Sequence, residues 1–470
     1  MLLRREFYLL ITLISTLLSC NNKPQENPQT INLLAAKQQI SAGHINAAID
    51  LLKNQTNQEA QLLLLQLYLQ THNLASAQTL LLELIKQYPE QLSYRKQLAS
   101  LQLQQQQPEQ AENTLREAVN DLNDNTEAAI LLVDFLARQK NIEIAIAELI
   151  PLLENQPDNI ELQLQMAHLQ LATGKISEAE QILKNIIAQY PNNIAAKIKL
   201  ARLYAQTQRL EPAQSALTEI LTIQANNTDA LLLRGEIKLA QKQITQAIEE
   251  FEQIIKAEPN NVNALKHLSL ALKQNNQPKL ASDILQKVVA LNPNNQNARV
   301  ELAVLLINSH NTELAQQQLS ELLKQNPQHQ AGLETLGKLY LINRQWQDAQ
   351  EIAHHLQNLF PNIASGYYLS GLIYNEQGHY NQSIKQFELA LTKQPHAIEP
   401  LTQLINTYLI TKQPKTAIEK LQHLIKREPK NFIAYHLLAQ VYEQNKQAAL
   451  AKQAFQQAAI LKNAMTNPIN

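Results

Sequence analysis

The chain has 470 residues, of which only 8 are glycine, and its 40 Lys and Arg residues nearly balance its 41 Asp and Glu residues. So few glycines argue against folds built on tight turns or on Gly-rich phosphate-binding loops. The net charge of −1 offers no general attraction for nucleic acid. The single cysteine excludes an intramolecular disulfide and a zinc site built from cysteines. With 45% hydrophobic residues, the chain can bury a large core and is predicted to be folded and mainly helical.

The first residues are typical of a secretory signal. Arg4 and Arg5 precede an apolar run from Phe7 to Leu18 that contains only mild polar breaks. This run is shorter than the roughly 20 residues that a membrane-crossing helix needs. Residues 1–19 are therefore predicted to be a signal peptide.

The predicted signal ends at the only cysteine of the chain. Residues 17–20, Leu-Leu-Ser-Cys, resemble the box at which bacterial lipoproteins are cleaved and lipidated. The resemblance implies that Cys20 becomes an acylated N-terminus that anchors the protein in a membrane. In Gram-negative lipoproteins, an Asp after the cysteine favours the inner membrane. Asn21 occupies that place here, which implies an outer-membrane lipoprotein facing the periplasm if the cell is Gram-negative, and the polar residues 20–30 are predicted to be a tether.

The rest of the chain is built from one repeating unit of about 34 residues. Prolines recur at this spacing or at twice this spacing, at Pro89, Pro157, Pro191, Pro259, Pro293, Pro327, Pro361, Pro395 and Pro429. Twelve residues before each of these prolines stands Ala or Ser, as at Ala145 and Ser383. In this phase, residues 58–465 divide into twelve equal blocks without insertion or deletion. Because proline cannot continue a helix interior, it is expected to end a helix near the close of each block.

This block pattern resembles the tetratricopeptide repeat, in which each unit forms two antiparallel helices. Block position 8 is small in most blocks, position 11 is Tyr in six, and position 24 is large and apolar in eleven. Small residues at positions 8 and 20 suit a close crossing of two helices, where a larger side chain would overpack the contact. Gly174 and Gly378 fall between the two predicted helices, where a left-handed residue helps. The resemblance implies an all-α fold, a right-handed α-solenoid superhelix of about twelve to thirteen antiparallel helix pairs whose core arises by stacking.

The two ends of the array are expected to be caps. Residues 31–57 are predicted to be an imperfect extra helix pair, because Gly43 and Ala48 keep the internal spacing of a block. The last block places four polar residues where a further block would need apolar contacts, namely Lys452, Gln453, Gln456 and Gln457. Residues 466–470 are left as a tail. The tiling leaves no space for a catalytic domain, so we expect no enzyme, no catalytic residues and no cofactor.

In the family that the blocks resemble, the first helices line a concave groove that binds protein partners. Block positions 2, 5, 6, 9, 12 and 13 face this groove, and we call them the groove positions. Candidate contact residues at these positions are Lys199, Arg202, Glu334, Lys338, Tyr368, Asn375, Gln403, Asn406 and His436, and the same positions carry Glu236, Lys266 and His267 in the middle blocks. This mixed-charge, amide-rich surface suits an extended peptide or a folded protein partner. Because Tyr368 departs from the core positions that most aromatic residues occupy, a partner site is predicted around it.

Two further kinds of site are not expected. The carboxylate clamp of the family needs Lys and Asn in one block, and Ser100 stands where Lys96 would require the Asn. His354 and His355 are neighbours on a predicted helix and face different directions, so no metal site is predicted.

Three functions fit the sequence. The first is a lipid-anchored scaffold for protein–protein interactions in the bacterial cell envelope, used in assembling a secretion, pilus or exopolysaccharide-export machine. The second is a cytosolic adaptor of the same repeat family, in which Cys20 merely closes an apolar run. The third is an enzyme of the glycosyltransferase type that carries a repeat array. Membrane contact is expected only through the lipid anchor, no nucleic-acid partner is expected, and the oligomeric state stays undetermined.

Overall fold

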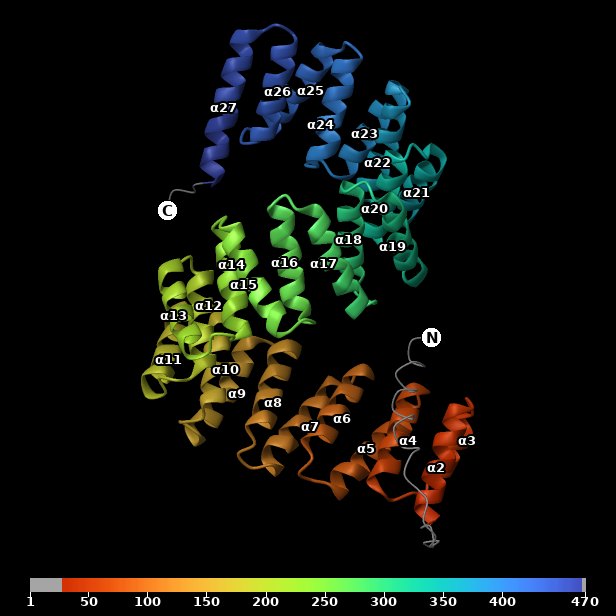
Figure 1. The fold of residues 1–470 in the computed structure, drawn as a ribbon, viewed down its shortest axis with the longest axis vertical. Helices are drawn as coiled ribbons and strands as arrows, with labels where there is room; N and C mark the ends of the chain where they lie inside the picture. Colours follow the sequence, from red (N-terminus) through yellow and green to blue (C-terminus); the bar gives the residue numbers. More distant parts are fainter. Residues whose placement is uncertain (1–27, 467–470) are drawn as a thin grey trace. The chain divides into compact units, whose positions relative to one another are not determined.

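The computed structural model describes residues 28–466, which form thirteen successive pairs of α-helices (Figure 1). The first helices of the pairs are α2 (Pro28–Ser41), α4 (Gln58–Gln70), α6 (Leu92–Gln104), α8 (Thr126–Gln139), α10 (Ile160–Ala172), α12 (Ile194–Gln206), α14 (Thr228–Ala240), α16 (Val262–Gln274), α18 (Gln296–Asn308), α20 (Gln330–Ile342), α22 (Ser365–Glu376), α24 (Ile398–Ile410) and α26 (Phe432–Gln444). The second helices are α3 (Ile45–Leu52), α5 (Leu74–Gln87), α7 (Pro108–Asp121), α9 (Ile142–Asn155), α11 (Ile176–Gln189), α13 (Leu210–Ile223), α15 (Ile244–Ala257), α17 (Pro278–Leu291), α19 (Thr312–Gln325), α21 (Trp346–Leu359), α23 (Tyr380–Lys393), α25 (Pro414–Arg427) and α27 (Ala448–Thr466). The predicted all-α solenoid of helix pairs is confirmed.

The described chain divides into two compact units, one running to Leu203 and the other starting at Tyr204. Within each unit the two helices of a pair contact each other and the second helix contacts the first helix of the next pair, as α8, α9 and α10 do in one unit and α14, α15 and α16 in the other. Several first helices also contact the next first helix directly, as α20 does with α22 and α22 with α24. Each unit is therefore a stack in which every pair buries its apolar seam against its neighbours.

The predicted signal peptide and Cys20 lie outside the described residues. Among the helices between residues 28 and 466, none combines the length and the apolar character that crossing a bilayer requires. The first helix, α2, begins at Pro28, three residues before the start expected for the N-terminal pair. Proline is favoured in the first turn of a helix, where its missing N–H would have no partner, so the helix can start within the stretch predicted as tether.

An asparagine immediately precedes most first helices and caps their N-terminus. In eight blocks the last residue of the preceding block is an Asn whose side-chain oxygen accepts the N–H three residues on, at Asn57, Asn125, Asn159, Asn193, Asn227, Asn261, Asn295 and Asn431. This bond satisfies one of the free N–H groups of the first turn. Ile363 and Ala397 replace the Asn before α22 and α24, which lack a side-chain cap, and α22 starts one residue late.

The small residues predicted at the helix crossings are buried, and the residue size there is matched to its neighbour. Position 20 is fully buried at Ala145, for example. A Cβ added to Gly371 would lie 2.4 Å from Cε1 of Phe387, and one added to Gly235 would lie 2.4 Å from Cε1 of Phe251. In these two blocks, Phe at position 24 is thus paired with Gly at position 8, because the ring occupies the space of a methyl group.

In eleven of the twelve blocks, the turn between the two helices contains a left-handed residue, and the exception is Lys140 with φ of −116°. Gly174 and Gly378 have φ of +78° and +74° there, as the sequence predicted. In nine other blocks the same position has φ between +55° and +62° without glycine, at His72, Gln106, Gln208, Lys242, Asn276, His310, Arg344, Lys412 and Lys446. These residues adopt a conformation that costs side chains with a Cβ roughly 1–2 kcal/mol.

Replacing Lys242 by glycine is expected to stabilise the second unit. The strain removed exceeds the added flexibility of the unfolded chain, so we expect a gain of about 0.5–1 kcal/mol in the free energy of unfolding. Urea unfolding of the variant measures this gain. Lys242→Ala is the matched control, because it removes the same exposed side chain and keeps the strain. Equal stability of the Gly and Ala variants would refute the explanation.

Candidate functional site

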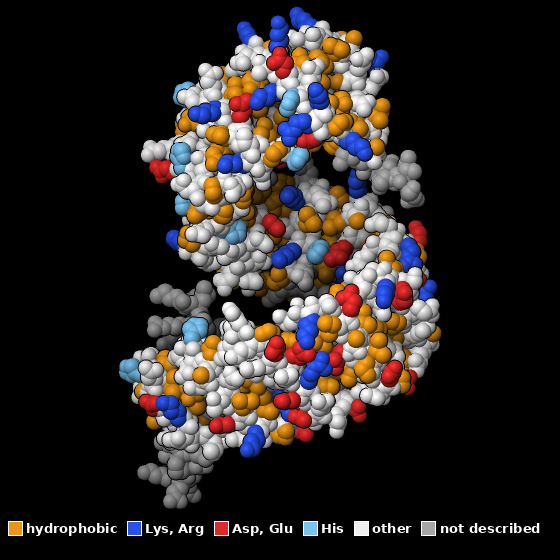
Figure 2. Space-filling view, turned by 180° about the vertical axis from the view of Figure 1, so that it is seen from behind, with side chains coloured by type: hydrophobic (Ala, Val, Ile, Leu, Met, Phe, Trp, Pro, Cys, Tyr) orange, Lys and Arg blue, Asp and Glu red, His pale blue; other side chains and the backbone are white. Residues whose placement is uncertain are grey.

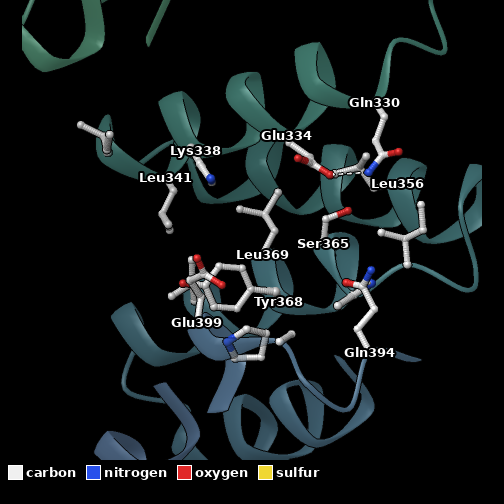
Figure 3. Close-up of a pocket in the computed structure, with 16 residues that line it drawn as sticks. Gln330, Glu334, Lys338, Leu341, Leu356, Ser365, Tyr368, Leu369, Gln394 and Glu399 are labelled. Carbon is white, nitrogen blue, oxygen red and sulfur yellow. Dashed lines mark hydrogen bonds between the residues drawn. The ribbon is translucent and has the colours of Figure 1, made fainter. Parts of the chain in front are cut away.

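A pocket of about 510 Å³ opens among α20, α22 and α24 in the second unit (Figure 3). Its lining includes Leu341 and Ile342 near the end of α20 and Leu369 and Leu372 on α22, all at groove positions. Leu369 is buried, Leu341 and Leu372 are half-buried, and Ile342 is 57% exposed. The stacked first helices thus present an apolar surface to solvent, which is typical of a ligand or peptide pocket.

Tyr368 stands at one end of this pocket. Its half-buried ring packs at 5.9 Å between centroids against Phe387, and Figure 3 shows Glu399 beside it. Burial raises the pKa of the Tyr368 hydroxyl, and the negative charge of Glu399 raises it further. The hydroxyl therefore stays protonated at neutral pH and can donate a hydrogen bond.

Charged and polar groups surround the apolar lining. Glu334 is half-buried and accepts a hydrogen bond of 2.8 Å from Nε2 of Gln330. Lys338 follows one helical turn later, exposed, and has no ion pair within residues 28–466. At the start of α22, the Oγ atom of Ser365 is buried and has no hydrogen-bond partner in the described part of the chain. The pocket thus combines apolar contact with hydrogen-bonding groups that a peptide backbone could use.

The structure brings three of the nine predicted contact residues together, since Glu334, Lys338 and Tyr368 all line this pocket. The other predicted residues of the second unit are Asn375, Gln403, Asn406 and His436, which lie on α22, α24 and α26 outside the lining. Oδ1 of Asn375 accepts a hydrogen bond of 3.3 Å from the hydroxyl of Thr407. The ring of His436 packs against that of Phe455, with 5.4 Å between the ring centroids. Lys199 and Arg202 are exposed on α12 in the first unit.

The apolar residues of the pocket and Glu399 were not among the predicted contact residues. One signal for them was available, because position 9 is polar in most blocks and Leu372 is one of the few apolar residues there. An apolar residue at an exposed groove position is a better marker of a contact surface than another polar residue.

A second feature of the groove positions is a histidine–glutamate pair on α16 and α14. Nε2 of His267 lies 3.2 Å from Oε1 of Glu236, and its Nδ1 lies 2.8 Å from the backbone oxygen of Asn263. Both ring nitrogens therefore face acceptors, which only the protonated imidazole can satisfy. The hydrogen bond to Glu236 raises the pKa of His267, against an opposing effect of burial and of Lys266.

This pair is expected to make stability depend on pH. Because the folded state holds the His267 proton more tightly than the unfolded chain, the pair stabilises the fold fully below the ordinary histidine pKa of about 6.5. Its contribution is lost as the pH rises through the raised pKa. An NMR titration of the His267 ring should show this raised pKa in the parent and a lower one in Glu236→Gln. An unchanged pKa in that variant would rule out Glu236 as the cause.

Within residues 28–466, no three His, Cys, Asp or Glu side chains cluster closely enough to hold a metal ion.

Comparison with solved structures finds distant likenesses. Yeast Tom70 is 14% identical with a TM-score of 0.44, and the match covers 92% of each chain. A tetratricopeptide repeat protein from Parabacteroides merdae is 19% identical with a TM-score of 0.40, covering 53% of this chain and 98% of that one. The APC/C hetero-tetramer Cut9–Hcn1 gives 14% identity, a TM-score of 0.36, and coverage of 88% of this chain and 96% of that chain. Likenesses this weak assign neither a partner nor an activity.

No curated protein matches the chain. Family models of the tetratricopeptide repeat do match it, one of them at residues 102–169, 145–192, 170–237, 238–290 and 272–339. Two further models of the same repeat match residues 364–396 and 406–468. The first model alone spans half of the chain, and its helix pairs are those of the structure. The chain therefore belongs to the tetratricopeptide repeat family.

Proposed function

We propose that this repeat scaffold is anchored by lipid at Cys20 in the bacterial cell envelope and holds a protein partner through an extended segment seated in the pocket of α20, α22 and α24. The observation that carries the binding role is the apolar pocket on the first helices, with the exposed Lys338 and the half-buried Glu334 and Tyr368 in its lining. Repeat arrays of this family are protein-interaction scaffolds, so the pocket marks where such an interaction is centred.

The pocket has the chemistry of a peptide site. Its volume of about 510 Å³ holds a large side chain with its flanking backbone. Leu341, Leu369 and Leu372 supply apolar contact. The protonated Tyr368 hydroxyl can donate a hydrogen bond to a peptide C=O group. Tyr368 adds a rigid aromatic surface, the kind of residue on which binding energy concentrates.

The anchor rests on the sequence of residues 1–20. A cleaved signal and two or three acyl chains on Cys20 would hold the protein stably on a membrane. By the same resemblance, Asn21 favours the outer membrane and a periplasmic array in a Gram-negative cell. We propose a role in assembling a secretion, pilus or exopolysaccharide-export machine; the alternative is a cytosolic adaptor.

Acyl labelling decides between the anchored protein and the adaptor. We expect the parent protein to incorporate labelled palmitate and to fractionate with membranes. Cys20→Ala should incorporate none and leave the membrane fraction, and Cys20→Ser controls for side-chain size. A Cys20→Ala protein that still sediments with membranes would contradict the anchor.

Site-specific photo-crosslinking tests the pocket. A photoreactive amino acid replaces Ile342, which is exposed and lines the pocket, or Glu419, which is exposed on α25 outside it. We expect a partner adduct in the native envelope from position 342 and none from position 419. Tyr368→Ala, combined with the probe at 342, should weaken the adduct. Equal adducts from both positions, or none from 342, would count against the pocket.

A further inference from the structure

We infer that the groove positions of blocks nine to twelve, residues 330–465, recognise a basic peptide segment that inserts one large apolar side chain into the pocket. This inference rests on the proposed function and adds the chemical class of the partner. It is carried by the distribution of charge between the groove positions and the rest of these blocks.

Charges in the last three blocks are segregated. Residues 364–465 contain eleven Lys and Arg and six Asp and Glu, a clear basic excess. All eleven basic residues lie away from the groove positions, namely Lys385, Lys393, Lys412, Lys415, Lys420, Lys426, Arg427, Lys430, Lys446, Lys452 and Lys462. Figure 2 shows Lys and Arg side chains prominent over the end of the molecule that carries α25–α27.

The groove positions of the same blocks have the opposite sign. They hold three carboxylates and no cation, at Glu376 on α22, Glu399 on α24 and Glu443 on α26. Block nine adds Glu334 and Lys338. With four carboxylates and one ammonium group, the groove positions of blocks nine to twelve are acidic, although the last three blocks as a whole are basic. The groove therefore attracts a basic partner and repels an acidic one.

These groove carboxylates are available to a partner. Glu376, Glu399 and Glu443 are exposed and make no ion pair or hydrogen bond within residues 28–466. Carboxylates outside the groove are partly used inside the fold, since Glu388 pairs with Lys420 and Glu428 lies 3.3 Å from His396. Of these three carboxylates, Glu399 lines the apolar pocket, where a Lys or Arg beside an apolar residue of the peptide would engage it.

The helices that carry these groups lie in one row. Contacts join α20 to α22, α22 to α24, and α24 to α26. Packed helices are about 8–10 Å apart, and an extended peptide advances about 3.3 Å per residue, so three peptide residues span one repeat. A side chain in the pocket at α22 therefore places the residue three positions away along the peptide near Glu399, which lines the same pocket at the start of α24. We expect a basic residue at that place.

A displayed library of random 12-residue peptides, selected on the full-length mature protein, tests both the pocket and the charge preference. We expect enriched peptides to contain one large apolar residue followed at three-residue spacing by Lys or Arg. Synthetic copies of the enriched peptides then serve as fluorescent probes in anisotropy titrations. Glu376→Gln/Glu399→Gln should weaken binding about tenfold, with a smaller salt dependence of the remaining affinity. Glu419→Gln removes an exposed carboxylate outside the groove and should change nothing.

The outcomes separate the two proposals. Enriched peptides that are acidic or uncharged but lose binding in Ile342→Glu would overturn the basic preference and leave the peptide pocket standing. Basic peptides that bind Glu376→Gln/Glu399→Gln as tightly as the parent would also overturn the inference. Peptides that bind Ile342→Glu and Tyr368→Ala unchanged, or no enrichment at all, would overturn the pocket and the inference together.

Discussion

Gly371→Ala is expected to lower the free energy of unfolding of the second unit by about 3 kcal/mol, because its methyl group has no space. The added Cβ would lie 2.4 Å from Cε1 and 2.5 Å from Cδ1 of Phe387, a fully buried ring. The ring cannot move aside, since it fills the seam between α22 and α23 and also contacts Tyr368. Because repeat arrays can unfold in parts, hydrogen exchange of α22 and α23 should report the loss alongside urea unfolding.

The second variant that tests this explanation is Gly371→Ala/Phe387→Leu. It recreates the combination of Ala at position 8 and Leu at position 24 found in blocks four and five, with Ala167 and Leu183 in one and Ala201 and Leu217 in the other. We expect the double variant to recover much of the stability that Gly371→Ala loses, so the two substitutions should be strongly non-additive. If the double variant is as unstable as the sum of both single variants, the clash with Phe387 is not the cause. The same variants should also shift Tyr368 and so weaken peptide binding at the pocket.

Glu250→Ala is expected to cost about 3 kcal/mol, because it leaves two partly buried cations without a partner. The carboxylate is 6% exposed, accepts a 2.7 Å bond from Nη2 of Arg234 and is also bonded to Nζ of Lys238. Nε of Arg234 is already buried without a hydrogen-bond partner within residues 28–466, so the site has no other acceptor at hand. The loss should appear in urea unfolding and change little with salt, since the pair is shielded from solvent ions.

Two controls accompany Glu250→Ala. Glu252→Ala removes an exposed carboxylate from the same helix and should change stability by less than about 0.5 kcal/mol. Glu250→Gln keeps the shape and removes the charge, so it should fall between the parent and the alanine variant. A loss in Glu252→Ala as large as that in Glu250→Ala would show that the buried pair is not the cause, because alanine is at least as good a helix former as glutamate.

Much of the fold was predictable from the period of the sequence. A constant block length, with small residues at two positions and apolar residues at helical spacing, has one low-energy solution, a stack of helix pairs. Details that depend on single side chains were harder. Second helices end at the same block position with or without the recurring proline, as α7 and α13 do, because the next pair packs there in either case. The left-handed turn likewise persists at Lys242 and Arg344 without glycine.

The candidate site was predictable only in outline. Glu334, Lys338 and Tyr368 are both groove positions and lining residues of the pocket, because helical periodicity places those positions on one side of each first helix. Which of them share a pocket depends on side-chain volume across neighbouring repeats. Leucine occupies the block position of Leu341 in several other blocks, as at Leu239. Periodicity alone cannot rank these leucines, since the space left between helices follows from packing.

By itself, the sequence of this protein determined the helix-pair architecture, and it predicted the boundaries of the array and a lipid anchor at Cys20. These features are local or periodic, so they follow from residue type and spacing. Only the tertiary structure showed that Tyr368, Glu399 and apolar residues of α20 line one pocket. It also showed that Phe387 leaves no space for a Cβ atom at Gly371. Those relations join residues from different helices, and their energies depend on small differences in interatomic distance that no sequence period contains.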